Sequence, residues 1–199
     1  MRKTFSLATL LLLVTVGAGL VAAQTPSQPP APAPAATASA ADDLLGAWNR
    51  EAKKLVDMAE DFPEDKYNYK PTPEVRSFAE QLLHVAEANQ HFAQLARGQA
   101  AGPESHSEAN KSKAEIVTLL KKSFEEGATA IQKAGEAGLG QPIKLPTRTI
   151  TGYGLWTAGI INAAEHYGNL VVYYRLNGLV PPTTRAAQER QRQQQQPPR

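Results

Sequence analysis

The stretch AAEHYGNLVVYYRLNGLVPP, residues 163–182, decides the fold class because it joins a helical repeat to a clear end. Its apolar and aromatic residues recur at the spacing of one helix face, and the run stops at Gly178 and the prolines that follow. Extended upstream, the pattern predicts a helix over residues 155–177 with His166 beside its apolar face. A histidine in that place can bind a metal or fill a core, and the pattern leaves both open.

Three further segments carry apolar residues at helical spacing, which predicts helices over residues 42–60, 75–97 and 107–137. Asp42 is suited to cap the first of them. Residues 140–154 are punctuated by Gly and Pro, so we expect a long loop across one end and no strand. Four amphipathic helices of similar length predict an all-α, four-helix bundle built as one domain.

The two ends of the chain differ in composition from the bundle, which we place at residues 42–182. Residues 1–23 join Arg2 and Lys3 to a short apolar run and a small-residue cleavage site, as in a signal peptide. Export to the periplasm or the medium follows. Residues 24–41 predict a Pro/Ala-rich linker, and residues 183–199 a disordered Arg/Gln-rich tail. No segment after the signal is apolar for long enough to span a membrane.

Composition excludes several chemistries. The chain has no Cys, which removes disulfides, thiolate nucleophiles and Cys-based zinc sites. Without Arg2 and Lys3 the basic and acidic residues balance, and the bundle itself is acidic, so we expect no nucleic-acid partner. A di-iron bundle needs Glu-x-x-His on two helices, but Gln81 precedes His84 by three and Ala163 precedes His166.

Spacing limits which histidines can act together. His84 and His91 lie about 10 Å apart along one helix at 1.5 Å per residue, so at most one of them shares a site with His166. Asn162 and Tyr173 share a helix stripe with His166 and could hydrogen-bond to it in a core. His91 and His106 are expected to be solvated or structural.

The segments SFAEQLLHVAEANQHF, residues 77–92, and AEHYGNLVVYYRLNGLVPP, residues 164–182, resemble the DinB/YfiT-like superfamily. The resemblance covers residues 42–182. It implies a metal site in which His84 and His166 are ligands, with Asn162 at the position where the family carries a third histidine. It also implies zinc, nickel or iron as the ion, a small-molecule substrate or ligand, and a homodimer. An amide oxygen binds such ions more weakly than an imidazole does.

Two functions remain open, depending on whether a site with Asn162 in place of a histidine still binds a metal ion. One is a metal-dependent hydrolase or transferase acting on a small substrate, with export favouring the hydrolase over a thiol-dependent transferase. The other is a non-catalytic bundle that binds a small molecule or a partner and retains a degenerate metal site. A full His-x-x-x-His on the last helix would favour the enzyme, and its absence favours the binding protein.

Overall fold

The structure, a computed structural model, describes residues 38–99 and 111–195. The expected signal peptide, most of the expected linker, His106 and the last four residues of the tail lie outside these ranges. Among the helices of the two described ranges, none combines the length and the apolar character needed to cross a bilayer. Export is not tested by these residues and stays a prediction.

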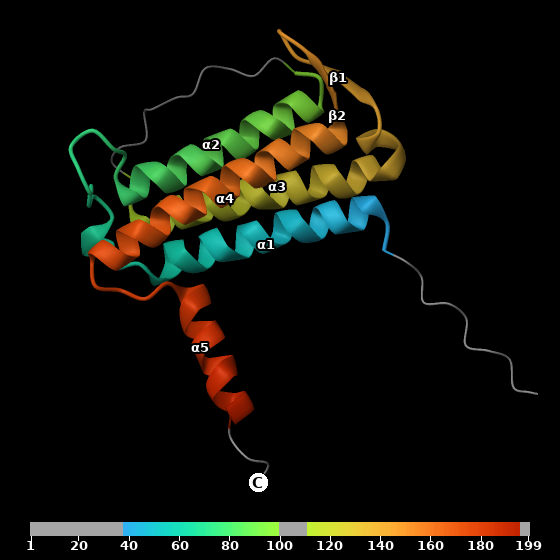
Figure 1. Ribbon diagram of the computed structural model, residues 1–199. Coiled ribbons are helices and arrows are strands. Elements are labelled where there is room, and N and C mark those ends of the chain that lie inside the picture. Colours follow the sequence, from blue (N-terminus) through green and yellow to red (C-terminus); the bar gives the residue numbers. More distant parts are fainter. Residues whose placement is uncertain (1–37, 100–110, 196–199) are drawn as a thin grey trace, which may run out of the picture. The chain divides into compact units, whose positions relative to one another are not determined.

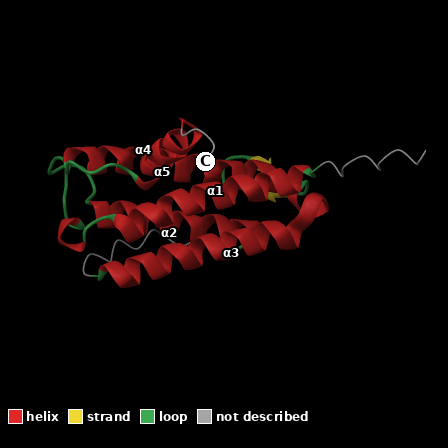
Figure 2. Cartoon of the chain, turned by 90° about the horizontal axis from the view of Figure 1, so that it is seen from below, coloured by secondary structure: helices red, strands yellow, loops and turns green. Residues whose placement is uncertain are grey.

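The described residues form a four-helix bundle with a hairpin and a fifth helix (Figure 1). The elements are α1 (Ala40–Asp61), the short 3-10 helix η1 (Glu64–Lys66), α2 (Phe78–Ala96), α3 (Lys113–Leu139), β1 (Pro142–Lys144), β2 (Thr149–Thr151), α4 (Gly152–Leu176) and α5 (Pro182–Gln195). Figure 2 shows the long helices running alongside one another with the two strands at one end. The predicted all-α bundle is confirmed.

Each predicted helix exists, but the capping residues, not the apolar repeat, set where it begins. In each of the first three helices a serine side chain accepts from the backbone N–H three residues on, while an acid at that position accepts from the serine N–H. The pairs are Ser39 with Asp42, Ser77 with Glu80, and Ser112 with Glu115. Asp42 is therefore the third helical residue rather than the cap.

Contacts between helices fix the direction of each one. The Lys113 amine donates to the carbonyl of Glu60 at 2.6 Å, so the start of α3 meets the end of α1. Helices α1 and α4 run parallel. Trp48 in the first half of α1 packs on Trp156 in the first half of α4, and the Tyr174 hydroxyl near the end of α4 donates to a carbonyl near the end of α1. With α4 antiparallel to α2, as shown below, α2 and α3 run parallel.

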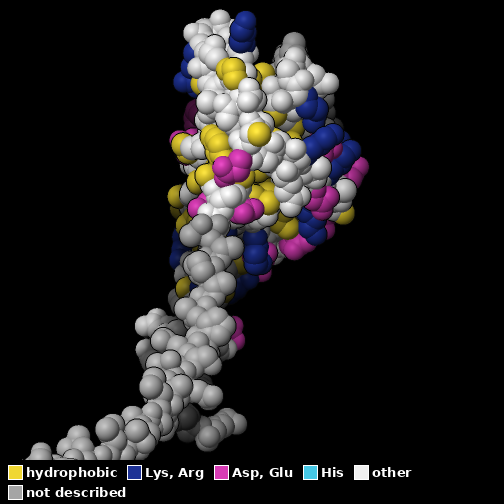
Figure 3. All heavy atoms as spheres, turned by 90° about the vertical axis from the view of Figure 1, so that its right-hand side faces the viewer, with side chains coloured by type: hydrophobic (Ala, Val, Ile, Leu, Met, Phe, Trp, Pro, Cys, Tyr) yellow, Lys and Arg dark blue, Asp and Glu magenta, His cyan; other side chains and the backbone are white. Residues whose placement is uncertain are grey.

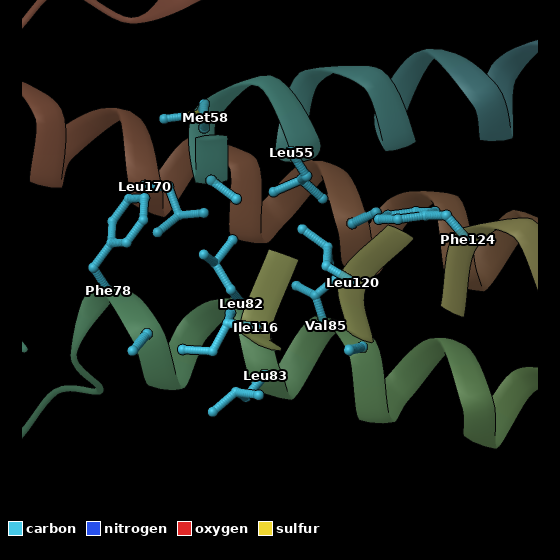
Figure 4. Packing of buried hydrophobic residues seen from close by; sticks show 14 of the residues in the cluster. Leu55, Met58, Phe78, Leu82, Leu83, Val85, Ile116, Leu120, Phe124 and Leu170 are labelled. Atoms are coloured by element: carbon cyan, nitrogen blue, oxygen red, sulfur yellow. The ribbon is translucent and has the colours of Figure 1, made fainter. Parts of the chain in front are cut away.

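The core runs along the middle of the bundle, where side chains from all four helices point toward one another (Figure 4). Leu55 comes from α1, Leu82 from α2, Leu120 from α3 and Leu170 from α4, and each is buried. Burying a leucine of this kind stabilises the fold by about 1.5–3 kcal/mol. This packing holds α2 and α4 side by side, which brings their polar edges together.

Two segments differ from the expectation. The predicted end loop, residues 140–154, contains a hairpin in which β1 pairs antiparallel to β2 with Ile143 opposite Ile150. Three-residue strands are too short to show an alternating pattern, so periodicity misses them. The predicted disordered tail is helical as far as Gln195. Pro182 suits the first helical position, and the Ala, Gln and Arg residues that follow are good helix formers.

Figure 3 views the bundle from the end that carries the hairpin. On this face, basic and acidic described side chains lie next to one another instead of forming a basic field. Phosphate backbones are bound by clustered Lys and Arg, so this face does not have the character of a nucleic-acid surface.

Candidate metal centre

The candidate site lies where α2 and α4 pack against each other, and two contacts set their relative position. The Tyr173 hydroxyl donates to the Arg76 carbonyl just before α2, and His166 contacts Gln81 one turn further along. Helices α2 and α4 are therefore antiparallel. Asn162, one turn before His166, lies at the level of His84. The antiparallel packing brings residues 84, 162 and 166 within about one helical turn of one another.

His84 and His166 meet directly across the two helices. Their ring centroids are 4.8 Å apart, and the ring planes are inclined by 69°. Two imidazoles that bind one ion through nitrogens at about 2.05 Å, with an angle of about 90–110° at the ion, have centroids about 4.5–5.2 Å apart. The observed separation falls in this range. The same separation suits an edge-to-face contact of two rings in a core.

The Nδ1 atom of His166 lies 2.7 Å from the Oε1 atom of Gln81. Both side chains are buried, with exposed fractions of 8% and 6%. The sequence had suggested Tyr173 as a hydrogen-bond partner of His166, but the Tyr173 hydroxyl instead donates to the Arg76 carbonyl. Gln81 was not recognised as part of the site. Its signal was the Gln-x-x-His spacing, which puts Gln81 and His84 on one face of α2.

Asn162 supplies the third polar group at this level. Its side chain is half-buried, and its Oδ1 atom is buried without a hydrogen-bond partner. Buried polar atoms in folded proteins are nearly always paired, so an orphaned oxygen one helical turn from His166 needs an explanation. A cation held at that oxygen would provide one.

Two carboxylates on these helices, Glu80 and Glu165, are engaged elsewhere or point away. Glu80, one turn before His84, accepts from the Ser77 N–H at 2.6 Å and pairs with Lys70 at 2.9 Å. The hydrogen bond from the Ser77 backbone, and then Lys70, hold the pKa of the Glu80 carboxyl below its usual value. Glu165 is exposed on the outer side of α4. Within residues 38–99 and 111–195, no three His, Cys, Asp or Glu side chains form a metal-binding group.

Two further polar residues, His91 on α2 and Asn169 on α4, lie outside the candidate centre. His91, which was expected to be solvated or structural, is exposed and contacts Phe92, with ring centroids 6.2 Å apart. Asn169, on the same stripe of α4 as His166, is also exposed. The candidate centre is therefore His84, His166 and Asn162, with Gln81 against His166.

The chain belongs to the DinB superfamily, whose family model matches residues 47–170. A DinB-like protein of Bacillus subtilis, YjoA, superposes with a TM-score of 0.56 at 25% identity, covering 68% of this chain and 92% of that chain. A DinB-like protein of Bacillus cereus gives a TM-score of 0.62 at 16% identity, covering 70% and 93%. A search of curated proteins gave no match.

YfiT of Bacillus subtilis, described as a probable metal-dependent hydrolase with an unusual four-helix bundle topology, has the same fold. It superposes with a TM-score of 0.59 at 12% identity and covers 74% of this chain and 94% of that chain. The predicted DinB/YfiT-like resemblance is confirmed. At this identity the likeness extends to the fold alone.

Proposed function

We propose that this chain is an exported DinB-type bundle that binds a divalent transition-metal ion through His84, His166 and Asn162. Two imidazoles and one amide oxygen form a site with neutral donors only, so the ion would keep its full charge. Zinc, nickel or iron suits the imidazole nitrogens. When bound, the ion would supply Lewis-acid chemistry to a small substrate, which makes a hydrolase the first candidate activity.

The observation that carries the proposal is the direct contact of His84 with His166, within about one helical turn of Asn162. His84 and His166 lie at the separation expected for a shared ion, and the buried Oδ1 atom of Asn162 has no hydrogen-bond partner. Gln81 contacts the Nδ1 atom of His166, and both of these side chains are buried.

The test is the metal content of the untagged chain, measured by inductively coupled plasma mass spectrometry after dialysis against zinc, nickel and iron. We expect close to one ion per chain in the wild type. The His84→Ala/His166→Ala double variant should be empty, and His91→Ala should bind as the wild type does. His91 is the matched control because it lies on α2 but outside the centre.

Equal metal content in the wild type and the double variant would contradict the proposal, as would a wild type that stays empty. If the site fills, a screen with small esters, amides and phosphoesters would test the hydrolase. Loss of turnover in the double variant, with the fold intact by circular dichroism, would connect the activity to this centre.

A second candidate function is a non-catalytic bundle that binds a small molecule or a partner. It is favoured by the contacts that already satisfy His166, namely its hydrogen bond to Gln81 and its edge-to-face packing on His84. Such contacts are typical of a structural polar pair in a core. An empty wild-type chain that is strongly destabilised by His166→Ala would support this function.

A further inference from the structure

We propose that Gln81 is a positioning residue that fixes the tautomer of His166 and turns its Nε2 lone pair toward His84 and Asn162. For its consequence on metal binding the inference rests on the proposed function. The tautomer itself does not, because it is a property of the metal-free protein. The observation behind it is the 2.7 Å contact between the Oε1 atom of Gln81 and the Nδ1 atom of His166.

The chemistry of the two groups decides where the proton sits. A side-chain amide oxygen can only accept a hydrogen bond, so the Nδ1 atom of His166 carries the hydrogen and donates it to Gln81. A neutral imidazole has one N–H, which leaves Nε2 with its lone pair. Only a nitrogen in that state can bind a metal ion or accept a proton. Gln81 therefore selects the ligand-competent form of His166.

The direction of the lone pair follows from the packing of α2 against α4. Gln81 lies nearer the start of α2 than His84 does, and His166 reaches it through Nδ1. The ring places Nε2 on the side away from Nδ1, and because Nδ1 meets Gln81 we infer that Nε2 is turned toward His84 and Asn162. The His84 ring lies against His166, and Asn162, one turn before His166, has a buried Oδ1 atom without a hydrogen-bond partner.

Because the contact is buried, the residue type at position 81 should affect the protonation of His166. With Gln81 and His166 both more than nine-tenths buried, the hydrogen bond is shielded from water and is not easily exchanged. A leucine at position 81 would keep the volume but remove the acceptor. A glutamate would keep an acceptor at nearly the same place. Removing such an outer partner of a metal-binding histidine typically costs about 10–100-fold in metal affinity.

The first test is the protonation of the imidazole nitrogens, read from long-range ¹H–¹⁵N spectra of the metal-free chain at a pH where His166 is neutral. We expect Nδ1–H on His166 in the wild type and in Gln81→Glu. In Gln81→Leu we expect a mixture closer to that of a solvated imidazole. Gln90→Leu is the control because residue 90 lies on the opposite side of α2. A wild-type His166 with its proton on Nε2, or an unchanged pattern in Gln81→Leu, would overturn the inference.

The second test is zinc affinity by isothermal titration calorimetry. Gln81→Leu should bind about 10–100-fold more weakly than the wild type, and Gln81→Glu should restore most of the affinity. Equal affinity in the wild type and Gln81→Leu would overturn the positioning role. A wild type that binds no ion would contradict the proposed function, while the nuclear magnetic resonance result would still decide the tautomer. Circular dichroism of each variant shows whether a change comes from misfolding.

Discussion

Position 162 is the residue at which this chain departs from the site that the family resemblance implies. Asn162 lies one turn before His166 and at the level of His84, so a histidine there would complete three imidazoles around one ion. We expect Asn162→His to bind zinc more tightly than the wild type by at least about tenfold, because an imidazole is a better ligand than an amide oxygen. Calorimetric titration of both proteins measures the change.

The control for this substitution is Asn169→His, which puts the new histidine on the same stripe of α4 but at an exposed position. It should leave the zinc affinity unchanged. If Asn162→His bound no better than Asn169→His, residue 162 would not face the ion.

Gly127 shows how a single missing side chain shapes the core. A Cβ atom built on this residue would lie 2.3 Å from the Cζ2 atom of Trp48, whose indole is fully buried and donates to the Phe124 carbonyl. We expect Gly127→Ala to lower the free energy of unfolding by about 1–3 kcal/mol, because the tryptophan has little room to move. Urea denaturation measures this loss.

Gly168 is the matched control, since it is also within a helix but a Cβ atom there meets nothing within 4 Å. Gly168→Ala should raise the free energy of unfolding by up to about 1 kcal/mol, through better helix propensity. Opposite signs for the two substitutions are the expected outcome. If both substitutions lowered the free energy of unfolding, close packing against Trp48 would not be what distinguishes the two glycines.

The fifth helix is tied to the bundle by an ion pair between Arg185 and Asp61, and by hydrogen bonds that include one between the Tyr167 and Thr183 hydroxyls. The Arg185 guanidinium donates to both carboxylate oxygens of Asp61 at the end of α1, and the Tyr174 hydroxyl lies 3.1 Å from the same carboxylate. The hydrogen bond from Arg185 is the main cause that lowers the pKa of Asp61. The pair is partly exposed, so water and salt weaken its contribution to the fold.

The sign of its pH dependence follows from the lowered pKa. A carboxyl whose pKa is lower when folded contributes stability that is present above its unfolded pKa, about 3.9, and is lost as pH falls through the folded value. We expect Arg185→Ala to raise the pKa of Asp61 and to lower the free energy of unfolding at pH 7 by no more than about 1 kcal/mol. The difference from the wild type should shrink below about pH 4.

Carboxyl chemical shifts of Asp61 and urea denaturation at pH 7 and pH 3 check this prediction. Arg190→Ala is the control, because Arg190 is on the same helix and exposed. A pKa of Asp61 that is unchanged in Arg185→Ala would contradict the role of the ion pair. A loss well above the expected limit at pH 7 would show that α5 is packed more firmly than its exposed residues indicate.

At the scale of the whole molecule, an ion that binds only the folded bundle must stabilise it. The ligand residues come from α2 and α4, which are brought together only in the folded chain. At an ion concentration 100 times the dissociation constant, the folded state gains about 2.7 kcal/mol. We therefore expect zinc to raise the melting temperature of the wild type by several degrees.

Differential scanning calorimetry with and without zinc measures this shift. The His84→Ala/His166→Ala variant should melt at the same temperature in both conditions. A rise of equal size in wild type and double variant would place the zinc elsewhere on the protein.

The sequence predicts the helices well because each depends on local information. Apolar residues three and four apart define a buried face wherever the partner lies, and Gly178 with its prolines ends the last helix. The capping serines Ser39, Ser77 and Ser112 were readable from the sequence too, but the prediction began the helices from the apolar repeat instead. The three-residue strands are too short to show a period, and α5 is a polar helix without an apolar repeat.

The candidate site was only partly predictable. His84 and His166 were paired by resemblance to the superfamily, since no spacing along the chain connects residues on separate helices. Gln81 was missed because its contact with His166 depends on the height at which α4 crosses α2. Tyr173 was named as an available partner of His166, but its hydroxyl donates to the Arg76 carbonyl, which the crossing of the helices brings within reach.

By itself, the sequence determined the all-α class, the four helices of the bundle and the donors available to a site, because these follow from residue type and from the 3.6-residue period. Only the tertiary structure decided that α2 and α3 run parallel and that α2 and α4 pack together with the His84 and His166 rings in contact. The physical reason is that packing joins residues far apart in the chain, and its register depends on how all the buried side chains interlock.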